Sequence, residues 1–154
     1  MRLMKLALVV TLVAAAYGVQ AQADPTVGTW KLNLARSKYN AGQPPKSSTV
    51  VIEAAGGGIK LTSNTVLADG SPRKIAYTAS YDGKDAVVTG TPDYDGMSLK
   101  KTANGFEGSR KKGGKVVQTY TRVVSADGKT MTVTSTGTTA AGGKVDNVQV
   151  YDKQ

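Results

Sequence analysis

The stretch Val27-Gly28-Thr29-Trp30-Lys31-Leu32 decides the fold. Side chains alternate between the two faces of a β-strand, so Trp30 and Leu32 share one face with Leu34, while Lys31 lies on the other. An apolar face that carries the chain's single tryptophan indicates the first strand of a small all-β domain. We expect Trp30 to plug one end of a barrel and Gly28 to let the chain pass close beneath the indole.

A secretory signal precedes this strand. Arg2 and Lys5 form a positively charged start, and residues 6–16 form an apolar run of the length that signals use. Small residues at Ala21 and Ala23 fit a cleavage site; we expect the cut after Ala23, with a cut after Ala21 as the alternative. The apolar run is shorter than the ~20 residues of a membrane span. The absence of cysteine excludes a lipoprotein.

The sequence therefore predicts a signal peptide over residues 1–23 and one barrel domain over residues 24–154. Roughly 130 residues are enough for a single domain with its own core. Without cysteine, this domain must be stable without disulfides, through packing and backbone pairing. We expect a monomer that is periplasmic or secreted.

Short alternating runs separated by glycine-containing turns fill the rest of the chain. The pairs Ile59 with Leu61 and Met131 with Val133 repeat the apolar face, and Thr132 lies on a solvent face. A sheet of about ten short strands curls and closes, which removes its edges, so the pattern predicts one antiparallel up-and-down β-barrel of about 8–10 strands. The strands are predicted at residues 28–34, 48–53, 58–66, 73–81, 85–90, 97–102, 105–111, 115–125, 130–137 and 144–153.

One segment, residues 35–46, breaks this rhythm. The adjacent Pro44 and Pro45 exclude a continuous helix or a central strand. We expect a loop with one helical turn that crosses a barrel mouth. It is either a lid over a cavity or a long surface connection.

Composition excludes several kinds of chemistry. The chain has no histidine and no cysteine, which removes triad hydrolysis, histidine acid–base catalysis and the usual zinc sites. Most of the eleven acidic residues occur in turn signals such as Asp69 and Asp127, and they form no acid pair. We therefore expect a protein that is not an enzyme and that has neither a cofactor nor a metal site.

The formal net charge of +9 falls by two, to +7, once Arg2 and Lys5 leave with the signal. A basic exported protein can meet anionic envelope polymers, but the basic cluster includes Phe106 as its only aromatic residue, so we expect no nucleic-acid partner. The cluster is either such a contact surface or a solvated hairpin. It consists of Lys100, Lys101, Arg110, Lys111, Lys112 and Lys115.

The chain resembles the calycins, the lipocalins and fatty-acid-binding proteins, at both ends. Gly28 and Trp30 match the opening of a fatty-acid-binding protein, and residues 147–153 resemble its final strand, where Tyr151 falls on the family's tyrosine. Gln149 replaces one arginine of that family's carboxylate clamp. The resemblance also implies that Arg122, in Tyr120-Thr121-Arg122, is an inward arginine. Fatty-acid-binding proteins have a two-helix lid and no leader, whereas this sequence has a leader and no room for such a lid. In these two respects the chain resembles short exported bacterial lipocalin-like proteins instead.

Two functions follow from these observations. The first is binding of a small hydrophobic or amphipathic, acidic ligand, with an arginine and phenol and amide donors at its head. The second is a ligand-free structural barrel that contacts anionic envelope polymers, with Arg122 on the surface. The candidate ligand-binding residues are Arg122, Tyr151, Gln149, Tyr120, Trp30 and Ile75. The apolar tail is expected against Leu32, Ile59, Leu61, Ile75 and Val133.

Overall fold

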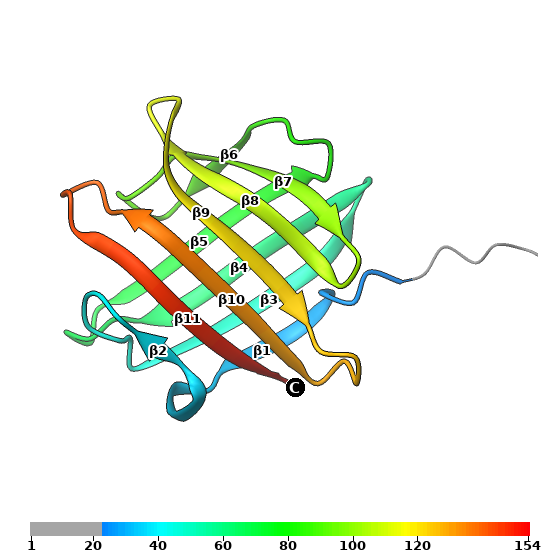
Figure 1. The fold of residues 1–154 in the computed structure, drawn as a ribbon, viewed down its shortest axis with the longest axis horizontal. Coiled ribbons are helices and arrows are strands. Elements are labelled where there is room, and N and C mark those ends of the chain that lie inside the picture. The colour runs from blue at the N-terminus through cyan, green and yellow to red at the C-terminus, as the bar shows by residue number, and fades with distance from the viewer. Residues whose placement is uncertain (1–22) are drawn as a thin grey trace, which may run out of the picture.

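A computed structural model describes residues 23–154 as one sheet rolled into a barrel (Figure 1). The predicted signal peptide lies outside the described residues except for Ala23. Between residues 23 and 154 no helix has the length and apolar character needed to cross a membrane. The elements are β1 (Gly28–Leu32), η1 (Leu34–Arg36), β2 (Lys38–Tyr39), β3 (Ser47–Ala55), β4 (Gly58–Val66), β5 (Pro72–Ser80), β6 (Ala86–Thr89), β7 (Gly96–Thr102), β8 (Gly105–Lys112), β9 (Lys115–Val124), β10 (Thr130–Thr138) and β11 (Lys144–Lys153).

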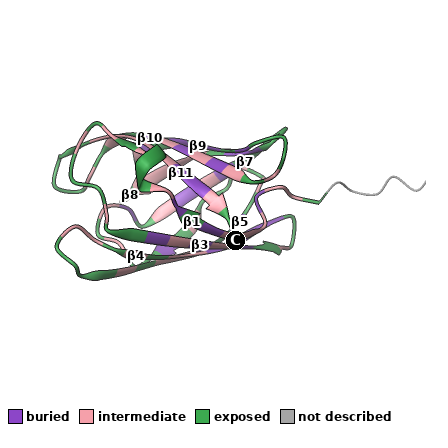
Figure 2. Ribbon diagram, turned by 90° about the horizontal axis from the view of Figure 1, so that it is seen from below, coloured by how far each residue is buried: buried purple, intermediate pink, exposed green. Residues whose placement is uncertain are grey.

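Pairing of the first strand with the last closes the sheet. From β3 to β11 each strand pairs antiparallel with the next along the chain, and β1 pairs with both β3 and β11. The short β2 attaches to β11 as an eleventh strand outside this ring of ten. The predicted all-β, antiparallel up-and-down barrel is therefore confirmed. Buried and exposed residues alternate along its strands (Figure 2), as expected when one face lines a core.

The first predicted strand is shorter than expected. It ends at Leu32, and η1 begins at Leu34, whose side chain is 41% exposed, so the prediction that Leu34 shares the core face is wrong. Asn33 causes the break: its side chain accepts a hydrogen bond from the Arg36 backbone N–H, and its Nδ2 donates to Asp152 at 2.7 Å. The chain then returns to β11 as β2, so the predicted loop holds one helical turn and two strand residues.

Trp30 fills one end of the barrel. Its side chain is 0% exposed, and its Nε1 donates to the carbonyl oxygen of Thr26 at 2.8 Å. Gly28 has φ +140°, and a Cβ there would lie 2.9 Å from the Cε of Lys153, whose ammonium is 5.1 Å from the indole centroid. A side chain at position 28 would displace this lysine from the indole, which explains the glycine.

Asp24 ties the segment ahead of β1 to the end of β5. Its carboxylate accepts hydrogen bonds from the Thr26 hydroxyl at 2.7 Å and from the Tyr81 hydroxyl at 2.5 Å. Burial by itself would raise the pKa of Asp24, but the bonds from Tyr81 and Thr26 outweigh it and lower that pKa below its ordinary value of 3.8. The ionised carboxylate therefore stabilises the closed end.

We predict that Asp24→Asn lowers the free energy of unfolding by about 1 kcal/mol at pH 7. Because the folded protein has the lower pKa, this contribution is fully present above pH 3.8 and is lost as the pH falls through the folded-state pKa. Denaturant titrations of both proteins between pH 2 and 7 measure the difference. Tyr81→Phe alone should lower the free energy of unfolding by a similar amount. The double variant Asp24→Asn/Tyr81→Phe should be little less stable than either single variant, because both substitutions remove the same hydrogen bond. If the difference in stability between the unmodified protein and Asp24→Asn stays constant down to pH 2, the ionised Asp24 carboxylate is not the stabilising group.

Candidate ligand-binding site

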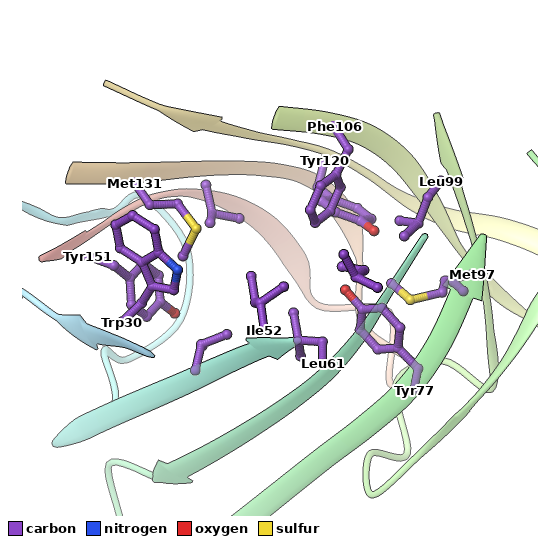
Figure 3. Packing of buried hydrophobic residues seen from close by; sticks show 14 of the residues in the cluster. Trp30, Ile52, Leu61, Tyr77, Met97, Leu99, Phe106, Tyr120, Met131 and Tyr151 are labelled. Atoms are coloured by element: carbon purple, nitrogen blue, oxygen red, sulfur yellow. The ribbon is translucent and has the colours of Figure 1, made fainter. Parts of the chain in front are cut away.

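A cavity of about 340 Å³ occupies the half of the barrel away from Trp30. Along β3, Ser48 and Val50 line it, whereas the next inward residue, Ile52, is packed into the core at the closed end. The same division holds on β10, where Val133 lines the cavity and Met131 does not. Figure 3 shows Trp30 and Met131 close together at that closed end, with the cavity-lining Tyr151 beside them. The loops at the other end, and Lys144 at the start of β11, complete the wall; the loop residues are Ala41, Gly42, Gln43, Pro45, Leu67, Ala68, Thr91, Asp93, Tyr94 and Thr139.

Two arginines on neighbouring strands turn into this cavity. Arg122 on β9 is 6% exposed, and its guanidinium lies 5.4 Å from the centroid of the Phe106 ring. Its one hydrogen bond within the described chain is a long contact of 3.6 Å from Nη1 to the Met131 sulfur. Arg110 on β8 donates from Nη1 to Gln118 Oε1 at 2.7 Å. In both residues the enclosed Nε has no hydrogen-bond partner among residues 23–154.

Neither guanidinium has a carboxylate partner in the described part of the chain. All the ion pairs among the described residues involve other side chains. Asp93 is the one acidic residue among those that line the cavity, and it lies 3.6 Å from Arg73. Arginine stays protonated in proteins, so both charges persist. An enclosed charge without a partner costs several kcal/mol, and an acidic ligand would offset that cost.

Tyrosines surround the two arginines. Figure 3 shows the hydroxyls of Tyr77 on β5 and Tyr120 on β9 pointing toward one another, and neither has a hydrogen-bond partner among the described residues. Burial raises the pKa of Tyr77, Tyr120 and Tyr151, so these phenols remain neutral donors. Gly108 on β8 makes room for Tyr120: a Cβ there would lie 3.0 Å from the Tyr120 hydroxyl oxygen and 2.2 Å from the Ser98 carbonyl oxygen.

The sequence-predicted residues divide into three groups. Four of them line the cavity: Arg122, Tyr151, Gln149 and Ile75. Tyr120 is buried, and its ring centroid lies 4.5 Å from the Arg110 guanidinium. Trp30 lies at the closed end, away from the cavity wall. Of the predicted tail contacts, Leu61, Ile75 and Val133 line the cavity, whereas Leu32 and Ile59 are buried in the core and do not line it.

The Gln149 side chain forms a hydrogen bond within the protein. Its Nε2 donates to the Tyr39 hydroxyl at 3.0 Å, which links β11 to β2. Burial raises the pKa of Tyr39 to about 12, although the bond from Gln149 lowers it slightly. Gln149 therefore fixes the short β2 beside the cavity, and the amide is less free to bind a ligand than its position in the sequence suggests.

Arg110 is the cavity residue that sequence reasoning assigned to a surface cluster. Phe106, Gly108 and Arg110 alternate along the inner face of β8, and this alternation could have identified the arginine. A register shift between Arg110 and Lys111 then turns the following residues outward. Lys111 and Lys112 pair with Asp85 and Asp95, at 2.6 and 3.5 Å. The predicted basic surface therefore loses Arg110, and two of its lysines are partly neutralised.

The chemistry open to this site is the binding of an anion. Within residues 23–154 no group of three or more histidine, cysteine, aspartate or glutamate side chains is placed to hold a metal ion. Charge-assisted hydrogen bonds from guanidinium groups to an anion are stronger than bonds between neutral groups. Apolar residues Leu61, Ile75 and Met97 line the same cavity, so the site has apolar surface beside its guanidinium groups.

Comparison with known proteins identifies the fold. No protein-family model matches the sequence, and no curated protein sequence matches it. Among solved structures, the zebrafish ileal bile acid-binding protein, crystallised with cholic acid, aligns with a TM-score of 0.50 over 84% of this chain and 99% of its own. The sequences are 13% identical, so the likeness shows a calycin-type barrel similar to that of the fatty-acid-binding proteins and nothing about the ligand.

We predict that Arg122→Met raises the free energy of unfolding of the ligand-free protein by about 1–3 kcal/mol, because methionine fills similar space without an unpaired charge. Chemical denaturation after removal of bound small molecules by unfolding and refolding measures the change. The control is Arg36→Met. This arginine pairs with Asp152 at 3.1 Å on the surface, and its loss should change stability by less than about 0.5 kcal/mol. Destabilisation by Arg122→Met would show that the guanidinium is adequately paired.

Proposed function

We propose that this protein binds a small amphipathic anion inside its barrel, with the acidic group held by Arg110 and Arg122. The observation that supports this function is the pair of guanidiniums that face one cavity with no carboxylate partner in residues 23–154. A protein without such a ligand gains nothing from two enclosed, unpaired charges. The phenol of Tyr77, which lines the cavity and has no hydrogen-bond partner among the described residues, supplies a further donor for the same group.

The shape of the cavity supports an amphipathic ligand. Its volume of about 340 Å³ is at the small end of the range of ligand pockets, roughly 300–1,000 Å³. The apolar side chains of Leu61, Ile75 and Val133 stand on strands β4, β5 and β10, opposite and beside the arginines. A ligand with a short aliphatic or cyclic body and one acidic end would use both kinds of wall.

The similar zebrafish barrel was crystallised with cholic acid, a small amphipathic acid. That complex supports the proposal in one respect: a barrel of this fold has room for such a molecule. The predicted signal peptide further leads us to propose that the protein meets its ligand in the periplasm or outside the cell. A carrier in that compartment needs no catalytic group.

We predict that the double variant Arg110→Gln/Arg122→Gln binds a fluorescent anionic fatty-acid probe at least tenfold more weakly than the unmodified protein, a loss of about 1.4 kcal/mol or more. Displacement of the probe by decanoate and by decanol separates the charge from the tail: the variant should lose its preference for decanoate over decanol. Arg36→Gln, on the outer surface, should leave both affinities unchanged. Unchanged binding by the double variant, or no binding by the unmodified protein, would overturn the proposed function.

A further inference from the structure

We infer that the buried headgroup of the ligand carries two negative charges rather than one. This inference rests on the proposed function and specifies its ligand class. It follows from the number of unpaired charges in the cavity, from their position beside one aromatic pair, and from the cost of leaving either one unpaired.

The charges that line the cavity do not cancel. Five charged side chains belong to the wall: Arg73, Asp93, Arg110, Arg122 and Lys144. Asp93 lies 3.6 Å from Arg73, and Lys144, which is largely exposed, lies 3.6 Å from Asp146. Of these residues only Arg110 and Arg122 are without a carboxylate, so the cavity has an excess of two positive charges.

Each guanidinium lies against one ring of a single aromatic pair. Arg110 is 4.5 Å from the Tyr120 centroid, Arg122 is 5.4 Å from the Phe106 centroid, and the two rings contact edge to face with centroids 6.2 Å apart. The strand register places Gly108 opposite Tyr120, between the positions of the two arginines. Because Gly108 has no side chain, no side chain of β8 stands between Phe106 and Arg110 on the inner face.

The burial of Arg122 and the partial burial of Arg110 favour a dianion. A monoanion would pair with one guanidinium and leave the other inside the cavity without a carboxylate partner, which is unfavourable. A headgroup with two charges pairs with both, and each pair consists of charge-assisted hydrogen bonds. A phosphate monoester and a group with two carboxylates on one carbon share this chemistry, and both fit the inference.

The test compares headgroups of similar shape and different charge. Octyl phosphate takes on its second negative charge near pH 6, whereas octyl sulfate remains a monoanion throughout. Calorimetric titration of the unmodified protein at pH 5 and pH 8, below micelle-forming concentrations, measures both ligands. We expect octyl phosphate to bind at least tenfold more tightly than octyl sulfate at pH 8 and with similar affinity at pH 5. A second pair of ligands tests the dicarboxylate headgroup in the same way: at pH 8 octylmalonate has two negative charges and nonanoate has one.

The sulfate series also controls for the protein. The titratable and charged groups that face the cavity are Tyr77, Tyr94 and Tyr151 together with the five side chains above. Octyl sulfate has the same charge at both pH values, so a change in these groups appears in its binding; a phosphate-to-sulfate ratio that rises while sulfate binding stays constant reports the charge of the headgroup. Either single variant, Arg110→Gln or Arg122→Gln, should bring that ratio at pH 8 close to one, whereas Arg36→Gln should leave it unchanged.

Each outcome decides one question. A tenfold preference for either dianion over its monoanionic partner supports the inference and names the headgroup. Equal binding of dianions and monoanions at pH 8 overturns it and leaves the proposed function intact. No binding of any of the four ligands overturns both. The measurements on the unmodified protein do not depend on the folding of any variant.

Discussion

The seam between β1 and β11 is the contact on which the rest of the structure depends. Antiparallel pairing of Trp30, Lys31 and Leu32 with Lys153, Asp152 and Tyr151 turns an open sheet into a ring. Closure removes the two exposed edges and creates an enclosed interior. Only inside such an interior do Arg110 and Arg122 become costly to leave unpaired, so the character of the site follows from this seam.

The two halves of the barrel have different tasks. Trp30, Phe106, Met131, Ile52 and Ile59 are almost fully buried and form the apolar packing of the closed end, where the indole also donates to Thr26. This end supplies the apolar burial that holds the fold together without disulfides. The open half contains the unpaired guanidiniums and the hydroxyls of Tyr77 and Tyr120. Such a division, in which one half stabilises and the other binds, is common where function requires groups that lower stability.

Local pattern was sufficient to predict the strands. Alternation of apolar and polar residues, with glycine at the turns, predicted ten strands and their antiparallel order, because each prediction depends only on neighbours in sequence. The break at Leu34 was missed, since it depends on a hydrogen bond from Asn33 to Asp152, far along the chain. The inward direction of Arg122 came from the resemblance to fatty-acid-binding proteins, and the structure agrees.

The site itself was only partly predictable. Arg110 looked like a member of a basic cluster because its neighbours Lys111 and Lys112 are charged, and the register shift that separates them cannot be identified from spacing alone. The cavity depends on the summed volumes of inward side chains and on the room left by Gly108, which are properties of the assembled barrel. Whether an arginine has a partner likewise depends on residues from several strands.

The central claim is that the closed barrel holds two guanidiniums in one cavity with no carboxylate of the protein to neutralise them. Diffraction at the bromine absorption edge, from crystals of the refolded protein soaked in bromide, tests it most directly. The account predicts an anomalous peak inside the barrel, in contact with both Arg110 and Arg122. Density that shows either guanidinium paired with a carboxylate or directed to bulk solvent, with no bromide inside, would contradict it.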